Sequence, residues 1–157
     1  MDFCRRPPAT LEVNLAPRRA VALLDAETPL DARGRRLDAE HALEGLPHLV
    51  GFELEPGGER LAAPGRSVLA SLNRRLSEPA LQPSEIRLAE HEVDLVLADT
   101  GTRVRLDPAG LEAQLRKLRV FEATLGEEPL PASVDLRFQD QVVVREKRMG
   151  HAGRRAR

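Results

Sequence analysis

The 157 residues are enough for one domain, which at this size buries about two-thirds of the surface that its unfolded chain exposes. Hydrophobic residues make up 41% and charged residues 31%, a globular composition that is too apolar for a disordered chain. The formal net charge of −1 argues against nucleic acid or an anionic membrane as the main partner. With no Trp, no Tyr and four Phe, the core must consist mainly of Leu, Val and Ala.

Targeting signals and disulfides are not visible in these residues. Cys4 is the single cysteine, so no intramolecular disulfide can form. The longest apolar runs, such as 20–24 and 93–98, are far shorter than the roughly 20 residues that span a bilayer. The start of the chain also lacks the apolar run of a signal peptide. We therefore expect neither a transmembrane helix nor an export signal within this sequence.

The first elements are predicted to be extended. Apolar and polar residues alternate over 11–15, which is the period of a half-buried strand, and Pro17 ends this strand. A second extended run covers 20–24. The sequence Asp-Ala-Arg-Gly at 31–34 predicts a turn with Gly34 in its left-handed position. The chain therefore begins as a meander.

The next stretch predicts a loop and then a helix. Residues 43–52 are too apolar for an exposed loop and contain too many Gly and Pro for a helix, so we interpret them as a buried connection. Pro64 and Gly65 open a helix that prolines at 79 and 83 close. Its apolar face consists of Val68, Leu69, Leu72 and Leu76.

Three strands and a second helix follow. Alternation over 86–97 and 104–106, with the turn sequence Asp-Thr-Gly at 99–101, predicts an antiparallel sheet. Asp107 is a candidate N-cap with Pro108 at the first helical position, and Gly126 ends the helix. The apolar positions of this helix are Leu111, Leu115, Leu118 and Leu125.

The last predicted element is a hairpin. Val134, Leu136 and Phe138 form its first strand, Gln139-Asp140 its turn, and 142–144 its second strand. The sequence from Arg145 onward is basic and poor in apolar residues, so we expect it to fray. The order of strands, helix, strands, helix, strands indicates an α+β fold with a mostly antiparallel, bent sheet.

No pattern of catalytic or ligand residues emerges. The four histidines lack a close ligand spacing, and no CxxC, GxSxG, Walker or dinucleotide motif is present. Glu90, Glu92 and Asp94 have the spacing of one strand face, which we interpret as a solvent-facing surface rather than an acid and base pair. The residues thus predict no metal, no cofactor and no enzymatic activity.

Five segments carry a further pattern. In chain order they are TLEVNLAPRRAVALL, LDARGRRL, LPHLVGFEL, LVLADTGTRVRLDPAGLEAQLRKLRV and SVDLRFQDQVVVR. Together, and in this order, they resemble the FtsQ/DivIB family of bacterial cell-division proteins. The last segment is the most specific, because the family closes its domain with a similar "DLR(Y/F)" strand. Asp107 stands where the family often has Gly, a local departure.

The resemblance implies a domain organisation. Members normally carry a cytoplasmic N-terminus, one transmembrane helix and a POTRA domain before the β-domain. On this basis residues 1–24 are the remnant of a POTRA domain running into the first β-domain strand. Residues 25–146 are the FtsQ/DivIB-type β-domain with two main helices, and 147–157 are a basic flexible tail. The implied location is the inner membrane at the division septum, with the domain on the extracytoplasmic side.

The resemblance also implies a function without enzymatic activity or cofactors. It indicates a scaffold of septum formation that binds FtsB/DivIC-like and FtsL-like partners through its last strands. The implied contact residues are Arg137, Phe138, Gln139, Asp140, Gln141, Val142, Val143, Val144, Arg145 and Glu146.

The physical form of such binding would be addition of a partner strand to the sheet edge. Phe138 is then the expected apolar anchor, and proline at Val143 should weaken binding if the N–H of that residue points outward. Two alternatives stay open. One is a POTRA-associated polypeptide-binding protein of outer-membrane assembly, and the other is an enzyme of cell-wall glycan, which would need facing carboxylates in a cleft.

Overall fold

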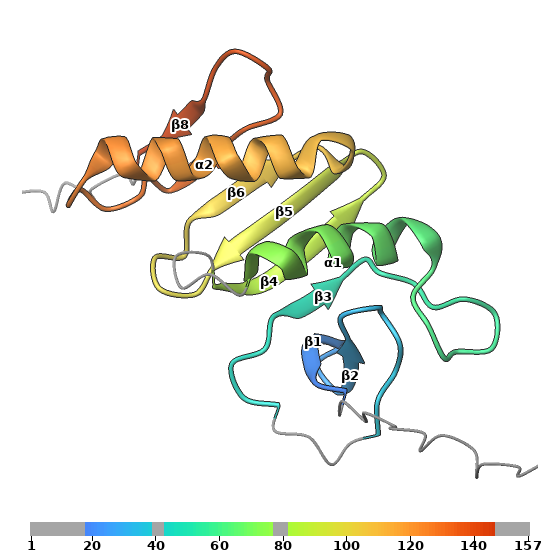
Figure 1. The fold of residues 1–157 in the computed structure, drawn as a ribbon. Helices are drawn as coiled ribbons and strands as arrows, with labels where there is room; N and C mark the ends of the chain where they lie inside the picture. The colour runs from blue at the N-terminus through green and yellow to red at the C-terminus, as the bar shows by residue number, and fades with distance from the viewer. Residues whose placement is uncertain (1–17, 39–42, 77–81, 147–157) are drawn as a thin grey trace, which may run out of the picture.

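The computed structural model describes residues 18–38, 43–76 and 82–146 (Figure 1). The predicted strand at 11–15 and the tail at 147–157 lie outside these residues. Within the described ranges, no helix is both long enough and apolar enough to cross a membrane.

One eight-stranded sheet forms the framework, in the order β2-β1-β3-β4-β5-β6-β7-β8. Four neighbouring pairs are antiparallel and three, β1·β3, β3·β4 and β6·β7, are parallel. The predicted α+β class with a mostly antiparallel sheet is confirmed. The strands are β1 (Ala20–Leu24), β2 (Thr28–Asp31), β3 (His48–Val50), β4 (Pro83–Ala89), β5 (Glu92–Leu97), β6 (Arg103–Leu106), β7 (Ser133–Asp135) and β8 (Val143–Arg145).

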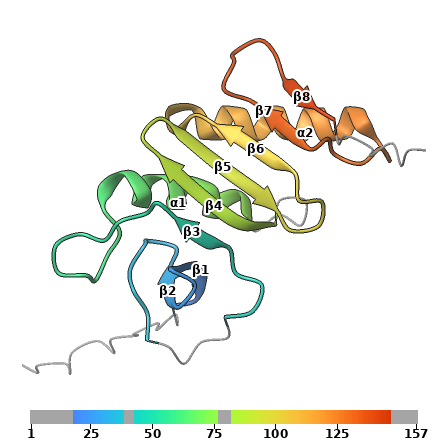
Figure 2. The same ribbon diagram turned by 180° about the vertical axis from the view of Figure 1, so that it is seen from behind.

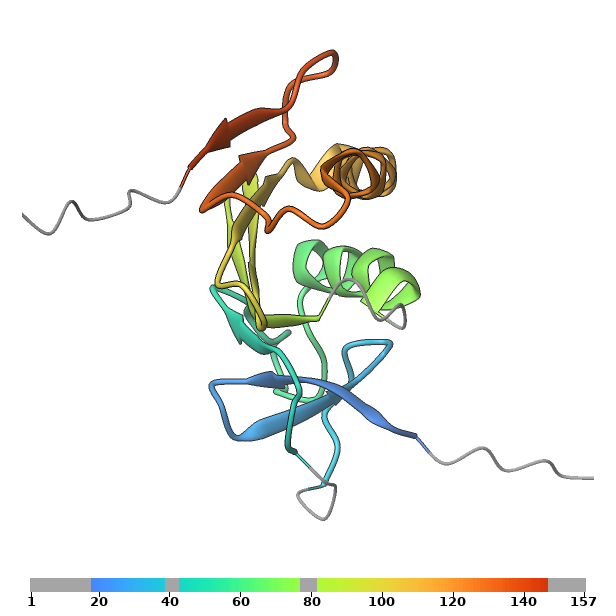
Figure 3. The same ribbon diagram turned by 90° about the vertical axis from the view of Figure 1, so that its left-hand side faces the viewer.

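Two helices cover one face of this sheet. Figure 3 shows α1 (Ala63–Leu76) and α2 (Leu111–Leu125) side by side on the same side of the strands. Their apolar faces meet the inward side chains of the sheet in one aliphatic core, as the absence of Trp and Tyr requires. The predicted core positions that are buried are Val68, Leu69, Leu72, Leu111, Leu115 and Leu118. Leu125 is only half-buried, and the side chain of Leu76 lies outside the described part.

Capping of the second helix is more elaborate than predicted. Asp107 does act as an N-cap, since its Oδ1 accepts a hydrogen bond from the N–H of Ala109 at 2.8 Å. The turn that it caps is a short 3-10 helix (Pro108–Gly110), and α2 begins after it. Gln114 closes the junction, because its Oε1 accepts from the N–H of Asp107 at 2.8 Å. The predicted end at Gly126 is confirmed.

The predicted extended run at 20–24 is confirmed as β1, whereas its hairpin partner β2 was missing from the predicted elements. The turn between the two strands places Asp25 and Ala26 at φ of 51° and 61°, a region that non-glycine residues rarely adopt. Pro29 lies inside β2, where proline cannot donate to a neighbouring strand. Both features make a strand at this position hard to predict from the sequence. The structure forms the strand nonetheless, with Leu23 of β1 opposite Pro29 of β2. The predicted turn at 31–34 is confirmed, with Gly34 at φ 69°.

The prediction of a buried connection at 43–52 was wrong. This stretch contains β3, which pairs in parallel with β1 on one side and β4 on the other. Leu49 is buried, whereas His48 is exposed and Val50 is 44% exposed, the alternation of a strand with one open face. Gly51 follows at φ 76°, and a Cβ built there would lie 2.3 Å from the carbonyl oxygen of Leu88. The glycine therefore permits the close approach of the chain to β4.

Candidate interaction edge

β8 lies at one margin of the sheet. Among the residues that the structure describes, it pairs only with β7, and Figures 1 and 2 show no strand beyond it. Val143 and Val144 are each 45% exposed. The opposite margin differs, because Leu30 of β2 bridges to Arg36 and the N–H of Leu37 donates to the carbonyl oxygen of Pro29 at 2.9 Å. A following segment of the chain covers β2.

The pairing of β7 decides which way its backbone groups point. On the β6 side, the N–H of Arg103 donates to Ala132 and the N–H of Leu136 donates to Arg105, both at 3.0 Å. Backbone groups of successive strand residues point to opposite sides. The even-numbered residues from Ala132 to Leu136 therefore face β6, and Ser133 and Asp135 face β8.

The orientation of the backbone groups of β7 determines the orientation of those of β8. Val143 pairs with Asp135 and Arg145 with Ser133, so their N–H and C=O groups point inward to β7. Val144 pairs with Val134, whose backbone groups face β6, and this is a non-hydrogen-bonded position of the ladder. The N–H and C=O of Val144 consequently point to the open margin. The outward donor is thus at Val144, so the condition stated for proline at Val143, an outward N–H, is met at Val144 instead.

The segment between β7 and β8 is longer than the predicted two-residue turn. It runs over residues 136–142, because β7 ends at Asp135 and β8 begins at Val143. Lys117 of α2 holds this connection, since its Nζ donates to the carbonyl oxygens of Phe138 and Gln139, each at 2.6 Å. The side chain of Phe138 is 45% exposed beside a hollow of about 380 Å³ between the connection and the start of α2.

Arg137 joins the base of the connection to the open face of the sheet. Its Nη2 lies 2.6 Å from Oδ2 of Asp135, and its Nη1 lies 2.5 Å from Oε2 of Glu92. The hydrogen bonds from Arg137 hold the pKa of Asp135 below its usual range, and the pKa of Arg137 is raised, chiefly by its bond to Asp135. Arg137 therefore supports the start of the connection.

The carboxylates expected on an exposed strand face are placed differently. Glu90 is exposed in the turn after β4, as expected. Asp94 is buried, with only 9% of its surface exposed. Its oxygens lie 3.9 Å from Nε of Arg103 and 3.7 Å from Nε of Arg105. Burial raises the pKa of Asp94, and the negative charge of Glu92 raises it further. The positive charges of Arg103 and Arg105 act to lower the same pKa. The cross-strand pairing of Asp94 with Arg105 follows from the hairpin register, a signal that sequence reasoning could have used.

The ten residues expected to contact a partner lie in one continuous stretch. Residues 137–142 belong to the connection, Val143–Arg145 form β8, and Glu146 follows directly. All are exposed except Val142, which is half-buried and packs against the core. Lys117 was not among the predicted site residues, because helical periodicity does not reveal a contact across 21 residues of sequence.

Comparison with known protein families places this chain. The family described as cell division protein FtsQ/DivIB, C-terminal, matches residues 22–137, which is more than half of the chain. The matched stretch ends within the connection, so β8 follows it. No curated protein matches this sequence. The match runs from within β1 to beyond β7 and includes both helices, and the chain belongs to the FtsQ/DivIB family of cell-division proteins through its C-terminal domain.

Proposed function

We propose that this domain is a non-enzymatic scaffold of the divisome that binds FtsB/DivIC-like and FtsL-like division proteins through β8 during septum formation. Membership of the family supports a role in cell division. The observation that carries the proposal is the open margin at β8, where the N–H and C=O of Val144 point away from β7. A partner strand that pairs with β8 satisfies both groups.

Strand addition also sets the side chains that a partner presents. Paired residues project to the same face of a sheet. Val144 lies opposite Val134 and therefore faces the helix side, where an apolar partner residue extends the core. Val143 and Arg145 lie opposite Asp135 and Ser133 and face the charged side. Alternating apolar and polar residues of the partner strand therefore determine the register in which it pairs with β8.

Phe138 supplies an anchor next to this strand. Phe138 is 45% exposed in the free domain. Large aromatic side chains contribute strongly to an interface when a partner buries them. The carbonyl oxygens of Phe138 and Gln139 are held by Lys117, so the backbone here is positioned before any partner binds. Preorganisation of this kind lowers the entropic cost of association.

The location that we propose is the extracytoplasmic side of the inner membrane at the division septum, as the family resemblance implies. A scaffold role fits the chemistry of the site. In the described residues, Glu92 and Asp135 form ion pairs with Arg137, and Asp94 lies between Arg103 and Arg105, so these carboxylates have structural partners.

Proline at Val144 tests the proposal. The substitution Val144→Pro removes the outward N–H and adds a ring at the margin, while the ladder to β7 uses Val143 and Arg145. We expect the affinity for the extracytoplasmic part of an FtsB-like partner to fall by more than tenfold, measured by calorimetry. Val144→Ala keeps the N–H and is the matched control, with a fall of a few fold. Equal affinities of the folded Pro and Ala variants would contradict strand addition at this residue.

A further inference from the structure

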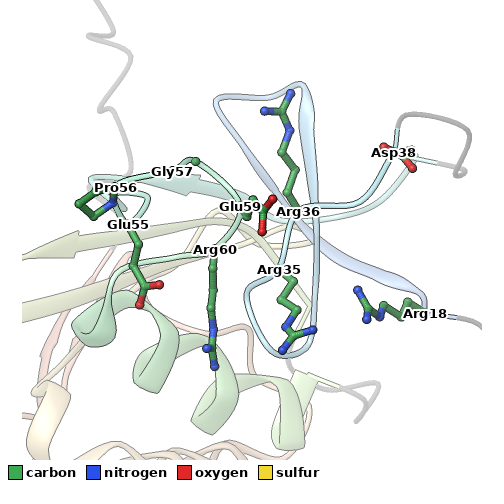
Figure 4. Close-up of a pocket in the computed structure, with 10 residues that line it drawn as sticks. Arg18, Arg35, Arg36, Asp38, Glu55, Pro56, Gly57, Glu59 and Arg60 are labelled. Carbon is green, nitrogen blue, oxygen red and sulfur yellow. The ribbon is translucent and has the colours of Figure 1, made fainter.

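A second region of interest lies at the other end of the sheet, away from β8. It is a surface hollow of about 710 Å³ formed by residues 35–38, residues 55–60 and Arg18 (Figure 4). The first two segments cross as a short ladder, in which the N–H of Arg36 donates to Glu59 at 2.9 Å and the N–H of Leu61 donates to Gly34 at 2.8 Å. This ladder is separate from the partner edge.

Two arginines of this ladder face each other directly. Arg35 and Arg60 form an antiparallel bridge pair, so their side chains project to the same side, as Figure 4 shows. Arg36, the next residue, extends to the opposite side. Like charges in directly opposed positions repel each other and destabilise a ladder. An anion bound between the two arginines would relieve this repulsion.

The neighbouring Glu55 does not supply that anion. It is bound by Arg66, whose Nη1 lies 2.6 Å from its Oε1. Throughout the described ranges, no ion pair involves Arg35 or Arg60, and Nε of Arg60 is buried without a hydrogen-bond acceptor. A buried donor without an acceptor is rare in folded proteins. Among the described residues, neither arginine of the bridge pair therefore has a carboxylate as an ion-pair partner.

We propose that Arg35 and Arg60 bind a phosphate group in this hollow. A guanidinium group offers a planar fork of N–H donors that fits phosphate oxygens, and two such groups match the double negative charge of a phosphate monoester. A single carboxylate is satisfied by one arginine and leaves the second unpaired. The phosphate can belong to a soluble monoester or to a lipid headgroup, and the experiment separates these sources.

The first test is a titration of the whole chain with inorganic phosphate, followed by NMR of the backbone amides. Sodium chloride at matched ionic strength is the reference. We expect saturable shifts confined to residues 34–36 and 59–61. Arg35→Gln and Arg60→Gln should each weaken binding at least tenfold. Arg116→Gln removes the same charge from the exposed face of α2, outside the hollow, and should leave affinity within about twofold. Equal losses in all three variants would show diffuse attraction and overturn the site.

Thermal unfolding gives a second reading that does not depend on NMR. Phosphate should raise the Tm of the wild-type chain and of Arg116→Gln above their values in chloride, and leave the Tm of Arg35→Gln unchanged. In chloride alone, Arg35→Gln should be at least as stable as the wild type, because the opposed charges are gone. A variant that loses stability in chloride would instead indicate that the arginine has a structural role, against the proposal.

Vesicles distinguish the two sources of phosphate. Binding to vesicles that contain phosphatidic acid, lost in Arg60→Gln and retained in Arg116→Gln, assigns the site to a lipid headgroup. Binding of inorganic phosphate and glycerol phosphate without vesicle binding assigns it to a soluble monoester. Absence of any phosphate-specific effect on the wild-type chain at millimolar concentration would overturn the proposal.

Discussion

Nζ of Lys117 lies 2.6 Å from the carbonyl oxygen of Phe138, and this contact ties α2 to the connection that leads into β8. The same ammonium group also donates to Gln139 at 2.6 Å. Charge-assisted bonds to backbone oxygens are stronger than neutral ones. The helix thus holds the middle of the connection over residues 136–142, between the buried Leu136 and the half-buried Val142.

The first prediction concerns this contact. Lys117→Met keeps an unbranched stem but removes the donors, so the two carbonyl oxygens lose their partner. We expect amide hydrogen exchange over residues 136–142 to become at least tenfold faster, and partner affinity to fall several fold. Arg116→Met on the exposed neighbouring position of α2 is the control. Unchanged exchange in the Lys117→Met variant would mean that the sheet alone positions the connection.

The second prediction uses the ion pair below the connection. Because Arg137 lowers the pKa of Asp135 in the folded state, the pair stabilises the fold above the unfolded pKa of about 3.9, and this stabilisation is lost as the pH falls through the lower folded pKa. Asp135→Asn should therefore reduce the free energy of unfolding at pH 6, on the order of 1 kcal/mol for a partly exposed pair. The difference should disappear in strong acid.

Urea unfolding at a series of pH values measures this difference. Asp140→Asn, in the exposed connection, is the matched control and should stay close to the wild type at every pH. A deficit of Asp135→Asn that is the same at pH 6 and in strong acid would assign its effect to packing rather than to charge.

The third prediction compares two glycines with nearly the same backbone conformation. Gly51 and Gly45 have φ of 76° and 75°, but only at Gly51 would a Cβ meet backbone, 2.3 Å from the carbonyl oxygen of Leu88. Both alanine variants bear the cost of positive φ. Gly51→Ala should be less stable than Gly45→Ala by about 1–3 kcal/mol in urea unfolding, because β3 must move away from β4. Equal losses would rule out the close approach as the cause.

The fourth prediction addresses the aliphatic core. Leu118 is fully buried beneath α2, whereas Val120 on the same helix is 66% exposed. Leu118→Ala should cost about 2–5 kcal/mol, from lost apolar burial and the remaining cavity. Val120→Ala should change stability by less than about 0.5 kcal/mol. Thermal and urea unfolding measure both, and comparable losses would place the core elsewhere along the helix.

Local sequence patterns predicted the elements whose contacts are local. The strands β4 to β6 alternate over consecutive hairpins, and the helices carry clear apolar faces, so their periodicity determines them. β2 and β3 were missed for different reasons. Pro29 and the turn at Asp25 argue against a hairpin, and β3 is held by parallel neighbours far away in sequence. Propensity is weak information for such strands.

The candidate site also has one part that the sequence could predict and another that it could not. The position of the last hairpin could be predicted from its alternation, and the structure keeps it at the sheet margin. The sequence could not predict which backbone groups of β8 point outward, because their direction depends on how β7 pairs with β6. A shift of one residue in that pairing would move the outward donor from Val144 to Val143.

The two margins of the sheet also differ in whether a strand can be added to them. In the part of the chain that the structure describes, the segment containing Arg36 and Leu37 covers β2, whereas β8 has a neighbour on one side only. Growth of the sheet is consequently one-sided. Segments of two division proteins that both pair with this domain as strands would have to share the margin at β8.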